Sequence, residues 1–338
     1  MVRGPFVGCV ISFAIFGLFP AGASEAVVER PAWLPEAAEP PPRFVGAWGV
    51  EGEAAGEMES PIGIAVDARD RLYVTEFHNH RVQVFDVDGR SLRTIGPVDH
   101  PGGIAVDRAG RVFVAAMLRG EIVVFDPTGT RRTTWGRPGA EPGELDEPGG
   151  LAIDARGDLF VADQSNHRIQ SFAADGTFRS AWGEHGSEDG RFGGAGPKGS
   201  RLSGPHFLAF DAARRLYSTE GANCRIQRFD AARRFERSWS DRGTGPGGFG
   251  GRLPHLRNPF VGPIGVAVDA RGRVWASSTN NRVQCFTAEG KFVTGLGDEG
   301  ATPGRFLIPH GLVFDSHGFL YVVDSGNHRI QKFAPAGR

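Results

Sequence analysis

Cysteine, net charge and long apolar runs are all scarce in this sequence. Three cysteines among 338 residues exclude a multi-cysteine zinc site. Cys224 and Cys285 lie in the body of the chain, where they either form a disulfide or remain buried thiols. The formal charge of −1 gives no reason to expect nucleic acid or an anionic membrane as a partner. Beyond the N-terminus, no apolar run reaches the roughly 20 residues of a membrane-spanning helix.

The first residues are typical of a cleavable signal peptide. Arg3 precedes a largely apolar run over residues 6–19, and residues 21–23 form a small-residue cleavage pattern. We assign residues 1–23 to this leader and expect an exported, periplasmic or secreted protein; an uncleaved N-terminal membrane anchor is the alternative. Residues 24–42 are rich in Pro, Ala and Glu without apolar periodicity, which favours a flexible linker.

Glycine and proline are abundant, and one pattern recurs six times between residues 61 and 334. The 50 glycines and 23 prolines favour short strands and turns, so we expect an all-β fold. In the first copy, strand-like runs at residues 61–67, 71–76, 79–85 and 92–96 are separated by Gly, Asp or Asn. The length of a copy fits a four-stranded propeller blade. An Asp ends the first run in every copy: Asp67, Asp107, Asp154, Asp211, Asp269 and Asp315.

An Arg opens the third run of every copy except the second, which has Glu121 there and is the degenerate one. The five are Arg81, Arg168, Arg225, Arg282 and Arg329. Because these residues recur, whereas a catalytic site is normally unique, we interpret them as a structural network. An acid ends the second run in four copies, and we expect it to pair with the Arg or His of the same or an adjacent blade. These acids are Glu76, Asp163, Glu220 and Asp324.

Three copies carry a motif that identifies a family. Asn79-His80-Arg81-Val82-Gln83 and its counterparts at residues 166–170 and 327–331 resemble the NHL repeat family. The resemblance covers nearly the whole chain after the leader and implies a six-bladed β-propeller over residues 43–338. The expected blade cores are residues 61–96, 101–136, 148–183, 204–239, 262–297 and 309–334.

The sixth copy has no fourth-strand pattern after Phe333, whereas the N-terminal part of the chain has a spare one. Residues 43–49 match the fourth strand at residues 178–183. We therefore expect residues 43–49 to pair with the last blade and close the ring, which hides an exposed strand edge.

Two histidines occupy the expected mouth of the central channel. The residues after the recurring Pro are, in order, Ile62, Gly102, Gly149, His206, Ile264 and His310. The contexts of His206 and His310 resemble the metal-binding motifs of peptidyl-α-hydroxyglycine α-amidating lyase, a six-bladed propeller that holds zinc with three histidines from alternate blades. The resemblance implies a divalent metal, zinc or calcium. It places the third ligand in blade 2, where this sequence departs from the pattern with Gly102; His100, two residues earlier, is the candidate for that role, or else His185 or His255. Alternatively, the two histidines line the mouth and are bridged by water.

The face around this mouth also carries the longest connections, at residues 183–204 and 239–262. Long loops on a rigid scaffold are frequent carriers of function. We expect a binding surface there that includes His185, Arg252, His255 and Arg257. The sequence thus favours a monomeric binding or scaffolding propeller for a protein, peptide or glycan, with no nucleic acid and no membrane span. A metal-dependent lyase or hydrolase centred on His206 and His310 is the alternative.

Overall fold

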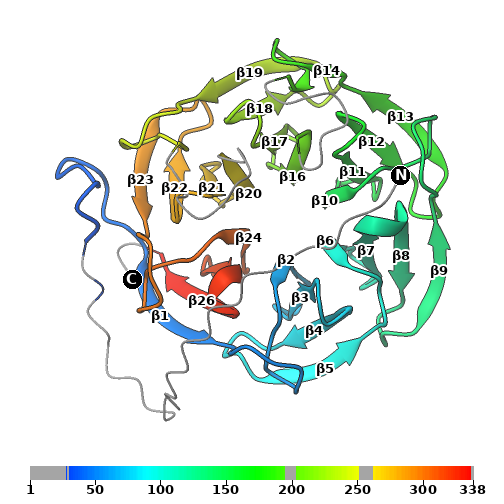
Figure 1. Cartoon of the computed structure of the whole chain (residues 1–338), viewed down its shortest axis with the longest axis horizontal. Helices are drawn as coiled ribbons and strands as arrows, with labels where there is room; N and C mark the ends of the chain where they lie inside the picture. The colour runs from blue at the N-terminus through cyan, green and yellow to red at the C-terminus, as the bar shows by residue number, and fades with distance from the viewer. Residues whose placement is uncertain (1–27, 29, 195–202, 251–261, 336–338) are drawn as a thin grey trace, which may run out of the picture.

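The protein is a ring of six four-stranded antiparallel sheets around a central axis, as the computed structural model shows for residues 28, 30–194, 203–250 and 262–335 (Figure 1). The first strand of each blade lies innermost, and the inner strands of neighbouring blades contact one another around the whole ring. The prediction of an all-β, six-bladed propeller is confirmed. None of the described residues forms a helix long and apolar enough to cross a membrane.

The strands follow the blades in chain order, from the inner strand to the outer one. Blade 1 contains β2 (Pro61–Val66), β3 (Leu72–Glu76), β4 (Arg81–Phe85) and β5 (Ser91–Ile95). Blade 2 contains β6 (Pro101–Val106), β7 (Val112–Ala116), β8 (Glu121–Phe125) and β9 (Arg131–Trp135), with the short helix η1 (Met117–Arg119) after β7. Blade 3 contains β10 (Pro148–Ile153), β11 (Leu159–Asp163), β12 (Arg168–Phe172) and β13 (Phe178–Trp182).

The other three blades repeat this order. Two short strands, β14 (His185–Gly186) and β15 (Phe192–Gly193), precede blade 4, which contains β16 (Pro205–Phe210), β17 (Leu216–Glu220), β18 (Arg225–Phe229) and β19 (Phe235–Ser240). Blade 5 contains β20 (Pro263–Val268), β21 (Val274–Ser278), β22 (Arg282–Phe286) and β23 (Phe292–Leu296). Blade 6 combines β24 (Pro309–Phe314), β25 (Leu320–Asp324), η2 (Ser325–Asn327) and β26 (Arg329–Ala334) with the N-terminal β1 (Arg43–Trp48).

Apolar side chains are buried between neighbouring blades. The second strand of every blade is buried along its whole length, because it is covered on both faces of its sheet. One hydrophobic cluster, for example, joins Tyr73 and Val84 of blade 1 to Val114 and Phe125 of blade 2. Burial on both faces explains why these strands are short apolar runs rather than alternating ones.

The N-terminal β1 closes the ring as the sequence predicted. It pairs antiparallel with β26, with Phe44 opposite Phe333 and a bulge before Gly46. A register shift occurs at the same place in the outer pair of blade 3, next to Phe172. The match between residues 43–49 and the other fourth strands therefore extends to the backbone irregularity, and the edge of β26 is covered.

The segment before β1 lies along the outer edge of blade 5 and does not extend as a tether from residue 30 onward. The indole nitrogen of Trp33 donates to Gly297 O at 2.8 Å, and Thr294 Oγ1 donates to Glu39 O at 2.6 Å. Gly295 makes this possible, since a Cβ there would stand 2.6 Å from the Trp33 ring. We call residues 30–42 the strap.

Each recurring Arg clamps the connection that leads into its own blade. Arg168 pairs with Asp163 at 2.7 Å and donates to three backbone carbonyl oxygens, those of Ala140, Glu141 and Glu144. The same pattern holds for Arg81, Arg225 and Arg329, each with the acid of its own blade. These four acids are fully buried. The expectation of an acid–Arg network is confirmed, within blades rather than between them.

We call the clamp the recurring Arg and acid of a blade together with the carbonyl oxygens that the Arg contacts. The Asn and Gln of the repeat complete it. In blade 3, Asn166 donates to Asp163 and to Gly139 O, while Gln170 donates to Asp163 and to Glu144 O. Burial raises the pKa of the Asp163 carboxyl, and the hydrogen bonds from the Asp146 N–H and from Arg168 oppose that rise. The Asn, Arg and Gln of the motif are therefore engaged by the scaffold.

The clamp also locates the two long connections. Arg168 reaches a carbonyl 28 residues earlier, whereas Arg225 reaches the equivalent one 38 residues earlier. The ten additional residues lie between the clamped segment, which ends at Arg191, and the start of β16. In blade 5, Arg282 likewise donates to a carbonyl oxygen 38 residues earlier, that of Thr244. In the sequence, both insertions thus fall between the clamped segment and the inner strand that follows it.

Blades 2 and 5 depart from the clamp in different ways. Blade 2 has Ala116, Glu121 and Val123 at the positions of the acid, Arg and Gln, and its incoming connection is short. Blade 5 keeps its Arg but has Ser278 in place of the acid. There, the Arg282 guanidinium lies 4.1 Å from the centre of the Trp33 ring, so the strap supplies a cation–π contact.

We predict that Arg168→Ala lowers the free energy of unfolding by about 3–5 kcal/mol, because it leaves the Asp163 carboxylate buried without its charge partner. Arg179→Ala is the control, since its side chain is 56% exposed and lies 3.9 Å from Asp158. That change should stay within about 0.5 kcal/mol. Urea denaturation measures both, and an Arg168→Ala protein as stable as the control would contradict the clamp.

We predict that Trp33 and Arg282 are energetically coupled. A double-mutant cycle of Trp33→Ala and Arg282→Ala should give a coupling of about 0.5–2 kcal/mol, the range of cation–π contacts. Thermal unfolding of the four proteins measures it. The pair Trp33 and Arg329 serves as control and should be additive, because Arg329 is held by Asp324. Additivity in both cycles would show that the strap does not stabilise blade 5 through Arg282.

Candidate functional site

The channel mouth lies on the face that carries the incoming connections, which we call the loop face. His206 follows Pro205 at the start of β16 and is 4% exposed. His310 has the same position in β24, is half-buried, and its Nδ1 lies 3.0 Å from Ile308 O. Burial lowers the pKa of His310 below its ordinary value, which favours the neutral imidazole. The structure thus places both predicted histidines at equivalent positions of alternate blades.

Gly102, the residue of blade 2 equivalent to His206 and His310, has no side chain that could bind a metal. A Cβ on Gly102 would stand 2.6 Å from the Cγ and Sδ of Met117, whose side chain occupies that space. Zinc needs three or four N, O or S ligands at about 2.0–2.3 Å. Among the described residues, no group of three ligand atoms includes His206 or His310. The three-histidine set of His206, His310 and His100 is therefore not formed.

His100 lies instead in a cluster with His80 and Asp99. It immediately precedes β6 with a backbone φ of 45°, as Ser60, Glu147 and Ile308 precede the inner strands of their blades. Its Nδ1 lies 2.5 Å from Asp99 Oδ1, and the rings of His100 and His80 are 4.3 Å apart. This position before the Pro, rather than after it, turns the side chain toward blade 1 and away from the channel.

Arg119 and Phe77 border the same cluster. Arg119 Nε lies 2.8 Å from Asp99 Oδ2, and the Phe77 ring meets the His100 ring edge-on at 4.8 Å. Although partial desolvation opposes it, the hydrogen bond from His100 lowers the pKa of Asp99, with further contributions from the charges of His100 and Arg119. His80, Asp99 and His100 are the one group among the described residues whose ligand atoms lie within 4.8 Å of one another.

A recess opens beside this cluster, where blade 2 lacks the clamp. It has a volume of ≈ 560 Å³ and is lined by His80, Pro97, Val98, Asp99, Ala116, Arg119, Glu121, Val123 and Arg131. Ala116, Glu121 and Val123 are the residues that replace the acid, Arg and Gln of the repeat. The recess therefore occupies the region where other blades hold a clamped connection.

Gln164 is a polar residue at the channel mouth that the repeat pattern does not account for. Its side chain is 2% exposed, and its Oε1 has no hydrogen-bond partner among the described residues. Its amide nitrogen lies over Gly149, since a Cβ there would stand 2.3 Å from Nε2. Buried acceptors are nearly always hydrogen-bonded in native proteins, so an unpaired one indicates a position for water or a ligand.

The other predicted binding residues lie partly outside the described region. His185 is in β14 and half-buried, with its ring 4.6 Å from that of His167. Arg252, His255 and Arg257 fall outside the described residues, as does the leader, residues 1–23. Cys224 and Cys285 are free and buried, and burial raises the pKa of the Cys224 thiol to about 11.

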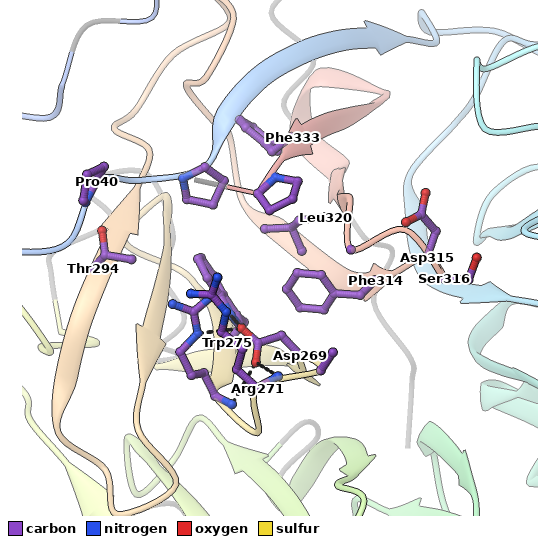
Figure 2. Close-up of a pocket in the computed structure, with 15 residues that line it drawn as sticks. Pro40, Asp269, Arg271, Trp275, Thr294, Phe314, Asp315, Ser316, Leu320 and Phe333 are labelled. Atoms are coloured by element: carbon purple, nitrogen blue, oxygen red, sulfur yellow. Dashed lines mark hydrogen bonds and ion pairs between the residues drawn. The ribbon is translucent and has the colours of Figure 1, made fainter. Parts of the chain in front are cut away.

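The opposite face carries a small cavity between blades 5 and 6. Figure 2 shows Trp275 of blade 5 on one side and Phe314, Leu320 and Phe333 of blade 6 on the other, with Pro40 of the strap at the edge of the cavity. Its volume is ≈ 140 Å³. Asp269 at the rim is paired with Arg273 at 2.7 Å. This mainly apolar seam is typical of packing between blades.

The sequence missed three residues of the loop face: His80, Asp99 and Gln164. His80 belongs to the repeated Asn-His-Arg triplet and was therefore interpreted as scaffold. The signal for Asp99 was its place next to His100 in the shortest connection, which leads into the degenerate blade. Gln164 had no signal, because its place over Gly149 depends on the tertiary structure.

Comparisons with known proteins agree with this architecture. The NHL repeat model matches residues 59–85, 145–172 and 306–333. Peptidylglycine alpha-amidating monooxygenase of Rattus norvegicus is 40% identical over 85 residues, which are 23% of this chain and 9% of that protein. NHL repeat-containing protein 3 of Homo sapiens is 33% identical over 92 residues, 26% of each chain. The matches thus span only a small part of these relatives.

Solved structures share the fold over most of the chain. Virginiamycin B lyase from Staphylococcus aureus has a TM-score of 0.56 at 16% identity, covering 86% of this chain and 98% of that one. A gluconolactonase from Xanthomonas campestris has a TM-score of 0.58 at 16% identity, covering 89% and 99%. Similarity at this identity carries the fold and not the activity. The chain is a six-bladed β-propeller that contains NHL repeats, distantly similar to the amidating monooxygenase.

Proposed function

We propose that this protein is an exported binding propeller whose channel mouth, on the loop face, takes a protein, peptide or glycan partner. The observation that carries the proposal is the buried Gln164 Oε1, an acceptor without a hydrogen-bond partner among the described residues. A partner that donates a hydrogen bond there would recover the free energy lost by burying that oxygen. His310 adds a second polar group at the same mouth, half-buried and in contact with Ile308 O.

Among the described residues, the recurring polar side chains of the repeat are used by the scaffold. The clamps engage the recurring Arg, Asn, Gln and acidic residues with the connections, as Gln170 does through Glu144 O, Asp163 and the Gly143 N–H. A metal-dependent lyase or hydrolase at His206 and His310 would need a third ligand from outside the position of Gly102, because Met117 fills the space where a third histidine would stand there. Binding is thus the function that the channel mouth supports best.

We predict that Gln164→Leu leaves the protein as stable as wild type, or more stable by up to about 1 kcal/mol, because it removes an unpaired buried acceptor. Gln170→Leu is the matched control in the same blade and should cost about 2–3 kcal/mol, since it breaks three hydrogen bonds of the clamp. Urea denaturation measures both. Equal destabilisation would place Gln164 in the scaffold and remove the basis of the proposal.

The partner is sought with defined probes. Wild type and Gln164→Leu are applied to a glycan array and to a random peptide library, with single-stranded RNA as a third probe. A glycan or peptide that binds wild type at least about tenfold more tightly than Gln164→Leu supports the proposal. Ligands that bind both proteins equally, or salt-sensitive RNA binding alone, would contradict it.

Export is part of the same proposal and rests on Arg3, the apolar run over residues 6–19 and the small residues 21–23. We predict that the protein recovered from the extracytoplasmic fraction begins at Ser24. N-terminal sequencing measures this. Protein that stays in the membrane fraction and keeps its first residues would instead support the N-terminal anchor.

A further inference from the structure

We propose that His80, Asp99 and His100 bind a divalent transition-metal ion of the zinc type beside the recess between blades 1 and 2. This site is separate from the channel mouth and does not depend on the function proposed there. It joins the last residue of the β3–β4 turn of blade 1 to the two residues that precede β6 in blade 2.

The cluster has the ligand types that zinc prefers. Two imidazoles and one carboxylate form a common three-ligand zinc set, which leaves a fourth position for water or substrate. Calcium and magnesium prefer sites made of oxygen ligands, so two nitrogen ligands argue against them. His80 and Asp99 line the recess, and so the fourth position is accessible from it.

The distances between the ligand atoms are those of a metal-free site in which His100 and Asp99 share a hydrogen bond. Asp99 Oδ1 lies 2.5 Å from His100 Nδ1 and 3.6 Å from His80 Nδ1. Ligand atoms on a tetrahedral zinc ion stand about 3.3 Å apart, close to the His80–Asp99 separation. Binding through His80 Nδ1 displaces the His100 N–H that this nitrogen accepts at 3.1 Å. The His100–Asp99 pair is at hydrogen-bond distance and has to widen by under about 1 Å when the metal replaces the shared proton.

The surroundings hold the ligands in place without enclosing them. Arg119 binds the other carboxylate oxygen of Asp99 at 2.8 Å and leaves Oδ1 toward the histidines. A charged or hydrogen-bonded group on the far oxygen orients a ligating carboxylate in many metal sites. The side chains of His80, Asp99 and His100 are 43%, 37% and 28% exposed, so an ion from solvent can reach them.

Blade 5 provides a variant that removes the imidazole and keeps the fold. His80 has a positive φ of 53° and accepts the His100 N–H at 3.1 Å. Asn281 stands at the same position of blade 5, has a φ of 62°, and accepts the Ile308 N–H at 2.8 Å. Asn adopts this conformation more readily than most residues. His80→Asn should therefore preserve the junction between blades while deleting one metal ligand.

The experiment titrates ZnCl₂ calorimetrically into the tag-free, EDTA-treated full chain, and follows CoCl₂ binding by visible absorption. We expect one ion per chain, a tetrahedral Co²⁺ spectrum and a Zn²⁺-dependent rise in Tm. His80→Asn and Asp99→Asn should each weaken Zn²⁺ binding by at least about 100-fold and abolish the Tm rise. His78→Asn is the control, since His78 is 53% exposed, lies outside the cluster and should bind Zn²⁺ like wild type.

Three results would overturn the proposal. The first is the absence of saturable Zn²⁺ and Co²⁺ binding in wild type. The second is Zn²⁺ binding that survives in both His80→Asn and Asp99→Asn but disappears in His206→Ala/His310→Ala, which would place the metal at the channel mouth. The third is an equal loss in His78→Asn. In EDTA the Tm of His80→Asn and Asp99→Asn should match that of wild type, so that lost binding is not confused with unfolding.

Discussion

A carboxylate buried at the end of the second strand of a blade is the group around which the ring is organised. A charge with no exposed surface is costly unless it is paired and hydrogen-bonded, and the Arg, Asn and Gln of the same blade do both. The same Arg donates its remaining N–H groups to the carbonyl oxygens of the connection from the preceding blade. The ion pair inside one blade thereby fixes the chain between two blades, and the ring is rigid where the loop face is built.

Blade 2 shows the result of losing this interaction. Without the acid, Arg and Gln, the blade lacks the side chains that hold a long connection elsewhere, and the chain crosses from Ile95 to Pro101 directly. The region that a clamped segment fills in other blades becomes a recess, and the residues before Pro101 meet the last residue of the turn in blade 1. Loss of a scaffold interaction thus brings His80, Asp99 and His100 together.

Blade 5 compensates for a smaller loss by another route. Its Arg282 has Ser278 opposite it in place of the acid, yet it still reaches the carbonyl oxygens of Thr244 and Gly245. The strap brings the Trp33 ring against the guanidinium, and Gly295 leaves the room for it. A glycine that would weaken an outer strand is therefore explained by a contact with a segment more than 200 residues away in the chain.

The number of blades, the strands, the closing role of residues 43–49 and the structural role of the recurring Arg could all be predicted from the sequence, because each follows from a repeated local pattern. The residues that meet at the loop face could not. His100 was assigned to the channel because it stands next to Pro101, but the direction of its side chain is set by a backbone with positive φ and by Asp99. The packing of Trp33, the burial of Gln164 and the approach of His80 to His100 each join parts of the chain that no repeat relates, so these contacts arise only when the ring is assembled.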